Sequence, residues 1–286
     1  MAGESLHSDH QRLFQSNRYV YPVISRRSRG LSIGVNLNPD KVCNFHCVYC
    51  QVNRQDESTT RFVDIPRLLD ELDAMLEMAQ TGQLFAPGSR FARTPNALRR
   101  LNDIAFSGDG EPTTFRNFDQ IVASCADLKC RRGLDQVKMV LITNASMFHR
   151  PHVQRALEIL DRNNGEIWAK LDAGTDEYFR LIDRSSIPLE RILDNITQAA
   201  QIRPIVIQSL FMRIDGNPPS QAELQAFCGR LREIHEAGGR LKLVQIYTVA
   251  RATAEDFVSP LGNSEVDAIA NLVRRETGLE TAAYYS

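Results

Sequence analysis

The sequence predicts an α/β fold, an incomplete TIM-like barrel with the pattern of a partial (βα)6 barrel. From about residue 32 onward, short apolar segments alternate with amphipathic segments, as expected for consecutive βα units. The chain has 286 residues, of which 43% are hydrophobic, and this is enough to bury a barrel-sized core. Each βα crossover is expected to be right-handed, so that successive parallel strands curl into an open, partial barrel.

Six short apolar segments are the expected strands. They cover residues 32–37, 103–106, 137–143, 166–172, 205–213 and 241–248. Residues 1–30 are expected to form an N-terminal extension. Residues 31–286 are expected to form one core domain that ends with a helix.

The segments between the strands carry recognisable helix signals. Apolar residues recur at helical spacing directly after Asp64, a suitable N-cap. Ser220 begins a capping-box pattern, and the helix that follows is expected to stop at Gly238. A second capping-box pattern at Ser264 predicts the start of the last helix, which is expected to end near Gly278. Residues 83–100 combine proline, glycine and arginine and are expected to form a basic insertion loop.

The most specific motif is a loop with three cysteines directly after the first expected strand. Cys43, Cys47 and Cys50 are separated by three and two residues, and no fourth cysteine lies nearby. Structural zinc sites close with four ligands, usually as two spaced pairs, and ordinary ferredoxin-type clusters use four thiolates. Three thiolates can hold three irons of a cubane and leave the fourth iron open for a chelating molecule. A zinc loop completed by His46, or three core cysteines, are the alternatives.

A second motif, Phe106-Ser-Gly-Asp-Gly-Glu-Pro-Thr113, follows the second expected strand. Gly108 and Gly110 allow the backbone to approach a ligand closely, and Glu111 can accept a hydrogen bond from a ligand ammonium group. A surface turn is the alternative, because glycine, aspartate and proline are common turn residues. Barrel enzymes carry their chemistry at the carboxyl ends of the strands, where both motifs are expected.

Together the two motifs resemble the radical S-adenosylmethionine (radical SAM) superfamily. Its signature is C-x3-C-x2-C with an aromatic residue, here Tyr49, before the last cysteine, and a Gly-Glu-Pro segment that binds the methionine amino group of the cofactor. Other segments are similar to a group of largely uncharacterised iron–sulfur oxidoreductases related to the tRNA enzymes that build the wyosine base. These segments are residues 21–27, 34–39, 41–45, 141–145, 170–173 and 244–249, with Arg251.

The resemblance implies a radical SAM core with a 4Fe-4S cluster, held by the three cysteines, and S-adenosyl-L-methionine. It implies an enzyme in which the reduced cluster cleaves S-adenosyl-L-methionine to a 5′-deoxyadenosyl radical, which abstracts hydrogen from a substrate. The electron is expected from an external donor of the flavodoxin or ferredoxin type. The residues expected to bind the cofactors are Tyr49, Gly108, Gly110, Glu111, Pro112, Thr143, Asn144, Asp172, Ile246 and Tyr247.

Lys170 and Asp172 are the candidates for a catalytic role, because they share one face of the fourth expected strand. A Schiff-base lysine and a plain ion pair between the two residues are the two interpretations of Lys170. Gln208, Arg213 and Gln245 are further groups expected to line the barrel mouth, together with the arginines before the first expected strand.

The substrate class is not encoded in a motif. The net charge of −1 does not indicate a dedicated nucleic-acid binder, so we expect a small-molecule or peptide-like substrate rather than tRNA. A tRNA-modifying enzyme related to wyosine synthesis is the alternative, in which Arg26, Arg27 and Arg29 would contact phosphates. A non-catalytic zinc- or cluster-binding protein is the alternative from another class.

The remaining cysteines and the length of the apolar segments indicate the cellular compartment. Cys125 and Cys228 lie in phase with apolar helix residues and are expected to face the core, so no auxiliary cluster is predicted; Cys130 has no assigned role. No apolar segment reaches the roughly 20 residues of a membrane span, and the first residues lack a signal-peptide core. These features predict a cytoplasmic protein without membrane contact.

Overall fold

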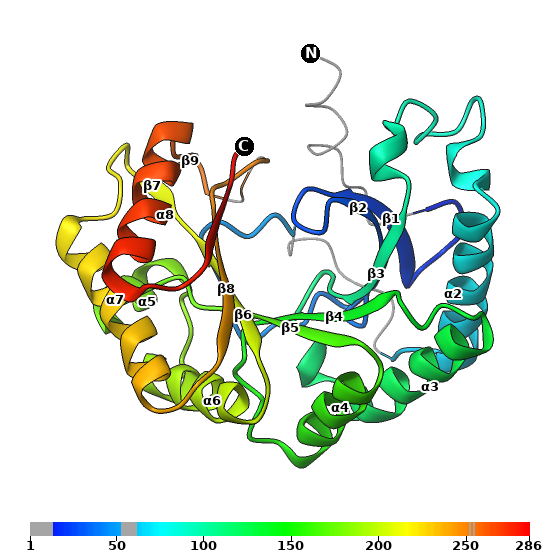
Figure 1. Cartoon of the computed structure of the whole chain (residues 1–286), viewed down its shortest axis with the longest axis horizontal. Helices are drawn as coiled ribbons and strands as arrows, with labels where there is room; N and C mark the ends of the chain where they lie inside the picture. Colours follow the sequence, from blue (N-terminus) through cyan, green and yellow to red (C-terminus); the bar gives the residue numbers. More distant parts are fainter. Residues whose placement is uncertain (1–13, 53–61, 252, 254) are drawn as a thin grey trace. The chain divides into compact units, whose positions relative to one another are not determined.

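The structure, a computed structural model, describes residues 14–52, 62–251, 253 and 255–286, and it comprises two compact units (Figure 1). The first unit consists of residues 1–42, 57–142 and 151–166. The second consists of residues 43–56, 143–150 and 167–286, and it therefore contains the cysteine loop.

In the first unit the strands lie in the order β1-β2-β3-β4. They are β1 (Val20–Ser25), β2 (Gly30–Val35), β3 (Leu101–Phe106) and β4 (Lys138–Thr143). β1 pairs with β2 in antiparallel orientation, whereas the other neighbours are parallel. The helices are α2 (Ile65–Gln80), α3 (Phe118–Arg131) and α4 (Pro151–Arg162), with short 3-10 helices η1 (Gln83–Phe85), η2 (Asn96–Leu98) and η3 (Pro112–Thr114).

In the second unit the strands lie in the order β5-β6-β8-β10, and all neighbours are parallel. They are β5 (Gly165–Lys170), β6 (Ile205–Leu210), β8 (Leu241–Tyr247) and β10 (Thr281–Tyr284). A separate antiparallel pair joins β7 (Met212–Ile214) to β9 (Val258–Pro260). The helices are α5 (Asp176–Ile182), α6 (Leu189–Ile202), α7 (Gln221–Glu236) and α8 (Asn263–Thr277).

All six predicted strands are present, as β2, β3, β4, β5, β6 and β8, with ends shifted by a few residues. The structure adds β1, which lies within the predicted extension and pairs with β2 along its whole length. Pro22 lies in this strand, which is tolerated because β1 is at the edge of its sheet. The extension boundary stays a prediction, and its first 13 residues lie outside the described residues.

The helix signals are mostly confirmed. Asp64 accepts a hydrogen bond from the first turn of α2, and Ser220 does so for α7. The predicted N-cap at Ser264 is wrong, because α8 begins at Asn263 and its N-cap is Gly262. The carboxylate of Glu265 accepts from the Gly262 N–H at 2.8 Å, so this pair, and not Ser264, starts the helix. Gly278 ends α8 in a left-handed conformation, as predicted.

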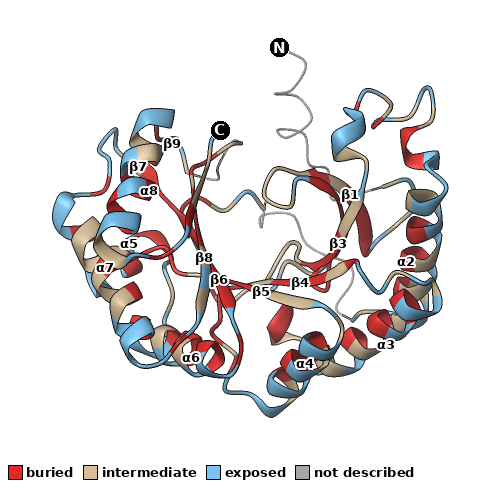
Figure 2. Cartoon of the chain, viewed as in Figure 1, coloured by how far each residue is buried: buried red, intermediate tan, exposed pale blue. Residues whose placement is uncertain are grey.

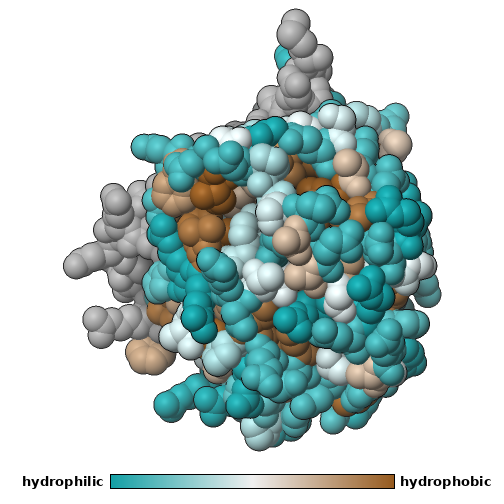
Figure 3. All heavy atoms as spheres, turned by 90° about the vertical axis from the view of Figure 1, so that its left-hand side faces the viewer, coloured by the Kyte–Doolittle hydropathy of each residue, from teal (hydrophilic) through white to brown (hydrophobic). Residues whose placement is uncertain are grey.

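The core lies between the strands and the helices that cover them within each unit. Figure 2 shows largely buried strands and helices with exposed outer faces. Cys125 and Cys228 are fully buried, which confirms their core-facing positions, whereas Cys130 is exposed. The side on which α7 and α8 lie is mostly hydrophilic, with small separate hydrophobic areas (Figure 3). Among the described residues, no helix has both the length and the apolar character needed to cross a membrane.

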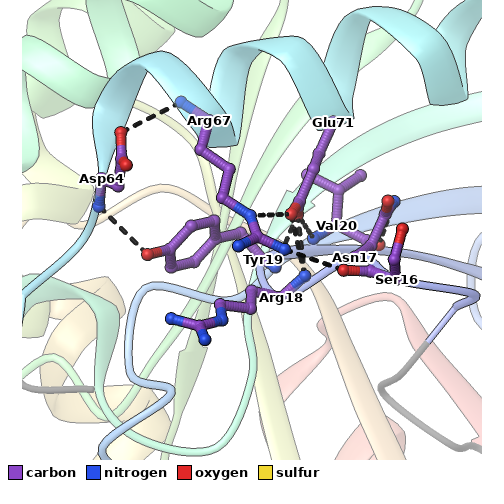
Figure 4. Close-up of polar contacts among 8 residues, drawn as sticks. All are labelled: Ser16, Asn17, Arg18, Tyr19, Val20, Asp64, Arg67 and Glu71. Atoms are coloured by element: carbon purple, nitrogen blue, oxygen red, sulfur yellow. Dashed lines mark hydrogen bonds and ion pairs between the residues drawn. The ribbon is translucent and has the colours of Figure 1, made fainter.

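Glu71 on α2 fixes the chain segment that leads into β1 (Figure 4). Its carboxylate accepts hydrogen bonds from the backbone N–H groups of Arg18, Tyr19 and Val20, at N···O distances between 2.8 and 3.2 Å. Arg67, one turn earlier on the helix, forms an ion pair with the same carboxylate at 2.9 Å. One buried side chain therefore satisfies the backbone donors at the start of an edge strand.

Glu71→Leu is expected to lower the free energy of unfolding by about 3 kcal/mol, because buried backbone N–H groups lose a charged acceptor. Urea unfolding followed by circular dichroism measures this change. Glu77→Leu is the control, since Glu77 lies on the same helix with its side chain 63% exposed. Equal urea midpoints for the two variants would contradict the prediction.

Candidate active site

Buried spacer residues anchor the cysteine loop within the second unit. Phe45 and Val48 are both buried, and the Phe45 ring packs edge-on against Phe179 of α5 with centroids 5.7 Å apart. The backbone N–H of His46 donates to the Asp183 carbonyl at 3.1 Å, and that of Val48 donates to the Ile182 carbonyl at 2.8 Å. The loop is therefore docked on the end of α5, and its apolar spacers are the residues that dock it.

The three cysteines form no disulfide and are of intermediate exposure. Cys47 Sγ donates to Asp183 Oδ1 at 3.3 Å, and burial together with the Asp183 carboxylate raises the pKa of this thiol. The alternative of three core cysteines is wrong, because each of the three keeps an intermediate exposure. Within residues 14–52 and the other described ranges, no group of three or more His, Cys, Asp or Glu side chains is close enough to hold a metal ion.

A buried polar network lies beside the loop in the second unit. Lys170 Nζ is 3.0 Å from Asp172 Oδ2 and 4.5 Å from the centre of the Tyr49 ring. The Tyr49 hydroxyl is 2.5 Å from Asp172 Oδ2 and 3.2 Å from Asp183 Oδ1. The second oxygen of Asp172 accepts the Leu210 N–H at 2.7 Å. The predicted ion pair between Lys170 and Asp172 is confirmed.

Burial and the neighbouring charges shift the pKa values of two groups in this network. Burial acts to lower the pKa of Lys170, but Asp172 and other negative groups nearby outweigh it, so the pKa of Lys170 is raised. Burial, and then the charge of Asp172, raises the pKa of the Asp183 carboxyl. A charged, ion-paired ammonium is a poor nucleophile, so the geometry does not favour a Schiff-base role for Lys170 in this state.

The glycine turn belongs to the first unit and follows β3. A side chain at Gly108 would overlap Asn36, and one at Gly110 would overlap Asn38 and the carbonyl oxygen of Val42. The Glu111 N–H also donates to this carbonyl at 3.3 Å. The close approach that the glycines allow is therefore to the chain that leads into the cysteine loop. Their contact with a cofactor stays a prediction.

Glu111 is 3% exposed and is the N-cap of η3, whose first residue is Pro112. Its Oε1 accepts hydrogen bonds from the Thr113 backbone N–H at 3.1 Å and from the Thr113 hydroxyl at 2.5 Å. The carboxylate thus has a local capping role, which the sequence motif did not indicate. The predicted contact of this carboxylate with the cofactor ammonium group stays a prediction.

Two other predicted residues lie at the turn after β4. The Asn144 amide donates to Asn44 Oδ1 of the cysteine loop at 2.8 Å, and the Asn44 amide donates to Ser146 Oγ at 2.7 Å. Thr143 is buried, and its hydroxyl accepts from the Ala145 N–H at 3.0 Å. The structure therefore brings Asn144 to the cysteine loop, whereas the Thr143 side chain stabilises the turn.

The two residues of β8 that were predicted to bind the cofactor differ in which of their groups a ligand could contact. The Ile246 side chain is fully buried, so only its backbone is available to a ligand. The Tyr247 hydroxyl lies 3.3 Å from Lys170 Nζ and joins the polar network. Asp183, which contacts both Cys47 and Tyr49, was not predicted. It is a single acidic residue after a short helix, and no spacing in the sequence marks it.

The arginines before β2 do not lie at the barrel mouth, where they were predicted. Arg26, Arg27 and Arg29 lie in the turn between β1 and β2, where Ser25 pairs with Gly30. This is the amino end of β2, whereas the cysteine loop follows its carboxyl end. The expectation that they line the mouth is wrong, because the unpredicted strand β1 carries them to the opposite end of the strand.

The sequence model of the Radical SAM superfamily matches residues 37–217, which is more than half of the chain and includes the cysteine loop and the glycine turn. This chain belongs to the radical SAM superfamily. It is 26% identical over 220 residues to a UPF0026 protein of Helicobacter pylori, covering 76% of this chain and 62% of that protein. It is 22% identical over 256 residues to a protein named GTPase Obg of Brachyspira hyodysenteriae, covering 88% of this chain and 33% of that protein. The radical SAM chain thus spans less than two thirds of the length of these relatives.

Two solved structures resemble the radical SAM chain. A radical SAM methyltransferase from Sphaerobacter thermophilus superposes with a TM-score of 0.64 at 13% identity, covering 93% of this chain and 69% of that chain. TYW1 with a lysine–pyruvate adduct bound superposes with a TM-score of 0.51 at 14% identity, covering 91% of this chain and 85% of that chain. At such identities the likeness shows the fold alone. It confirms the predicted partial (βα)6 TIM-like barrel, and the match to the superfamily model confirms the radical SAM core.

The radical SAM superfamily implies a 4Fe-4S cluster and S-adenosyl-L-methionine as cofactors. By its chemistry the donor set of this chain fits the cluster, because three thiols that form no disulfide lie within eight residues of one docked loop and thiolate ligands select iron–sulfur clusters. The alternative of a zinc site completed by His46 is not tested by the structure, in which the His46 side chain is exposed.

Proposed function

We propose that this enzyme is a radical SAM oxidoreductase in which Cys43, Cys47 and Cys50 hold one 4Fe-4S cluster. The observation that carries the proposal is the docked loop, which presents three half-buried thiols that form no disulfide. When bound, the cluster and S-adenosyl-L-methionine supply a 5′-deoxyadenosyl radical that abstracts hydrogen from the substrate. Superfamily members generally need an external electron donor, and we propose one of the flavodoxin or ferredoxin type, in the cytoplasm.

The other predicted residues take supporting roles in this proposal. Glu111, at the end of the turn formed by Gly108, Gly110 and Pro112, binds the cofactor ammonium group. Asn144, Ile246 and Tyr247 contact the rest of the cofactor, the isoleucine through its backbone. Asp172 holds the Tyr49 ring beside the last cysteine, a role supported by the short contact of its carboxylate with the Tyr49 hydroxyl.

Anaerobic reconstitution with iron and sulfide tests the proposal directly. We expect a brown protein that, with dithionite, converts S-adenosyl-L-methionine to methionine and 5′-deoxyadenosine, slowly in the absence of substrate. A colourless protein that retains zinc would instead support the non-catalytic alternative.

A small-molecule or peptide-like substrate remains our proposal over tRNA. The arginines that a tRNA-modifying enzyme would use for phosphate contacts lie at the amino end of β2, away from the end that leads to the cysteine loop. The likeness to TYW1 supports the second candidate, an enzyme related to wyosine synthesis, at the level of fold. Salt-sensitive, submicromolar binding of tRNA, lost when Arg26, Arg27 and Arg29 are replaced, would favour that candidate.

Glu111→Gln is expected to weaken S-adenosyl-L-methionine binding about ten- to a hundredfold, because one charge-assisted hydrogen bond contributes about 1.5–3 kcal/mol. The amide oxygen can still accept from Thr113, so the capping role is retained. Isothermal titration of the reconstituted protein measures the affinity. Glu158→Gln, at a side chain that is 58% exposed on α4, is the control. Unchanged affinity would mean that the glycine turn has only a structural role.

A further inference from the structure

A row of polar side chains crosses the sheet of the second unit. In the strand register, Lys170 on β5 lies opposite Gln208 on β6, and Gln208 lies opposite Gln245 on β8. These three residues, the polar row, share one face of the sheet. Gln208 is fully buried and Gln245 is 2% exposed. Amide side chains are mostly exposed in proteins, so two adjacent buried ones need a reason.

The polar row lies next to an apolar row on the same face. Two residues earlier along the strands, Trp168 lies opposite Val206, and both are buried. Methionine or leucine at positions 208 and 245 would continue this apolar surface. The amides are therefore not needed to fill the sheet face, and their polarity is the feature to be explained.

The hydrogen bonds within the polar row are incomplete. Gln208 Nε2 donates to Gln245 Oε1 at 2.8 Å, but Gln208 Oε1 is buried and has no partner among the described residues. A buried acceptor without a donor is costly and uncommon. The atom is therefore suited to receive a donor from a ligand.

Lys170 offers the complementary group. Its ammonium has three N–H donors, and the described residues provide two acceptors, Asp172 Oδ2 at 3.0 Å and the Tyr247 hydroxyl at 3.3 Å. Neighbouring strands are about 4.8 Å apart, so Lys170 and Gln208 can contact the same small group. Such a group must accept from the ammonium and donate to the amide oxygen.

We propose that the polar row is a substrate subsite that binds a primary carboxamide or a lactam. These groups present a carbonyl oxygen and an N–H on the same edge, one for Lys170 and the other for Gln208 Oε1. The apolar row formed by Trp168 and Val206 lies beside the carbon skeleton of the ligand. Assigning this group to the substrate rests on the proposed radical SAM function, because the same network contacts Tyr49 of the cysteine loop.

Two lactams of nearly equal shape test the subsite. The full chain, with and without added iron and sulfide, is examined by saturation-transfer NMR in the presence of 2-pyrrolidinone or N-methyl-2-pyrrolidinone. We expect at least threefold more transfer to 2-pyrrolidinone, because methylation removes the N–H that Gln208 Oε1 would accept. Equal transfer to the two lactams in the native chain would overturn the proposal without any variant.

A variant pair separates the subsite from non-specific binding. Gln208→Met keeps the length of the side chain, removes the acceptor and is expected to abolish the preference for 2-pyrrolidinone at an unchanged or higher melting temperature. Gln201→Met is the control, since Gln201 is exposed on α6, and the preference should persist there. A preference that survives Gln208→Met would overturn the proposal. Iron content, measured separately, decides the proposed cluster, so the two hypotheses fail independently.

Discussion

Replacing Cys43, Cys47 or Cys50 by alanine, one at a time, is expected to abolish the normal iron content of the reconstituted chain and all cleavage of S-adenosyl-L-methionine. A loop that supplies only three thiolates has no spare ligand, so each loss leaves one iron without a protein donor. Iron and sulfide analysis with visible absorption measures the cluster, and chromatography of 5′-deoxyadenosine measures cleavage.

Cys130→Ala is the matched control for these variants, because Cys130 is a free, exposed thiol on α3. It should bind iron and cleave the cofactor like the native chain. Full iron content in a variant that lacks all three loop cysteines would contradict the proposed ligands, whatever its activity.

Lys170→Met is expected to lower the free energy of unfolding by about 3–5 kcal/mol, because it leaves the Asp172 carboxylate buried without its cation. The Asp172 side chain is 1% exposed, and that of Lys170 is 20% exposed. Adding Asp172→Leu to this variant should restore part of the loss, since the unpaired Asp172 charge is then removed. Urea unfolding reports the changes, and Trp168, the single tryptophan of the chain, provides the fluorescence signal on the same strand.

Lys138→Met is the control for this pair of variants. Lys138 also forms an ion pair at a strand, with Glu166 at 2.9 Å, but its side chain is 43% exposed. Exposed pairs of this kind contribute about 0–1 kcal/mol. If Lys170→Met were no more destabilising than Lys138→Met, the network beside the cysteine loop would not depend on its central charge.

The strands that carry the fold could be predicted because their apolar segments are continuous and follow one another at βα spacing. β1 and β10 could not be predicted in this way. β1 contains Pro22 and pairs on one side only, and β10 is a short Thr-Ala-Ala-Tyr segment without an apolar pattern. Missing β1 also misplaced the three arginines, because its antiparallel pairing decides at which end of β2 they lie.

The site was predictable where spacing along the chain encodes it. The three cysteines and the glycine turn are local motifs, and the two-residue period of a strand placed Lys170 beside Asp172. Asp183 reaches Cys47 only because the cysteine loop docks on the end of α5. Gln208 meets Gln245 only through the register of β6 and β8. Contacts set by tertiary packing have no signature in a single sequence.

The docking of Phe45 and Val48 has a consequence for how the chain acquires its metal. In zinc fingers the ligand loop is disordered until the ion arrives, so metal binding and folding are one event. Here the spacers between the cysteines are packed and hydrogen-bonded to the end of α5 through protein groups alone. The conformational entropy of the loop is thus lost during folding rather than during cluster assembly, so a chelator should strip the cluster from this protein and leave it folded.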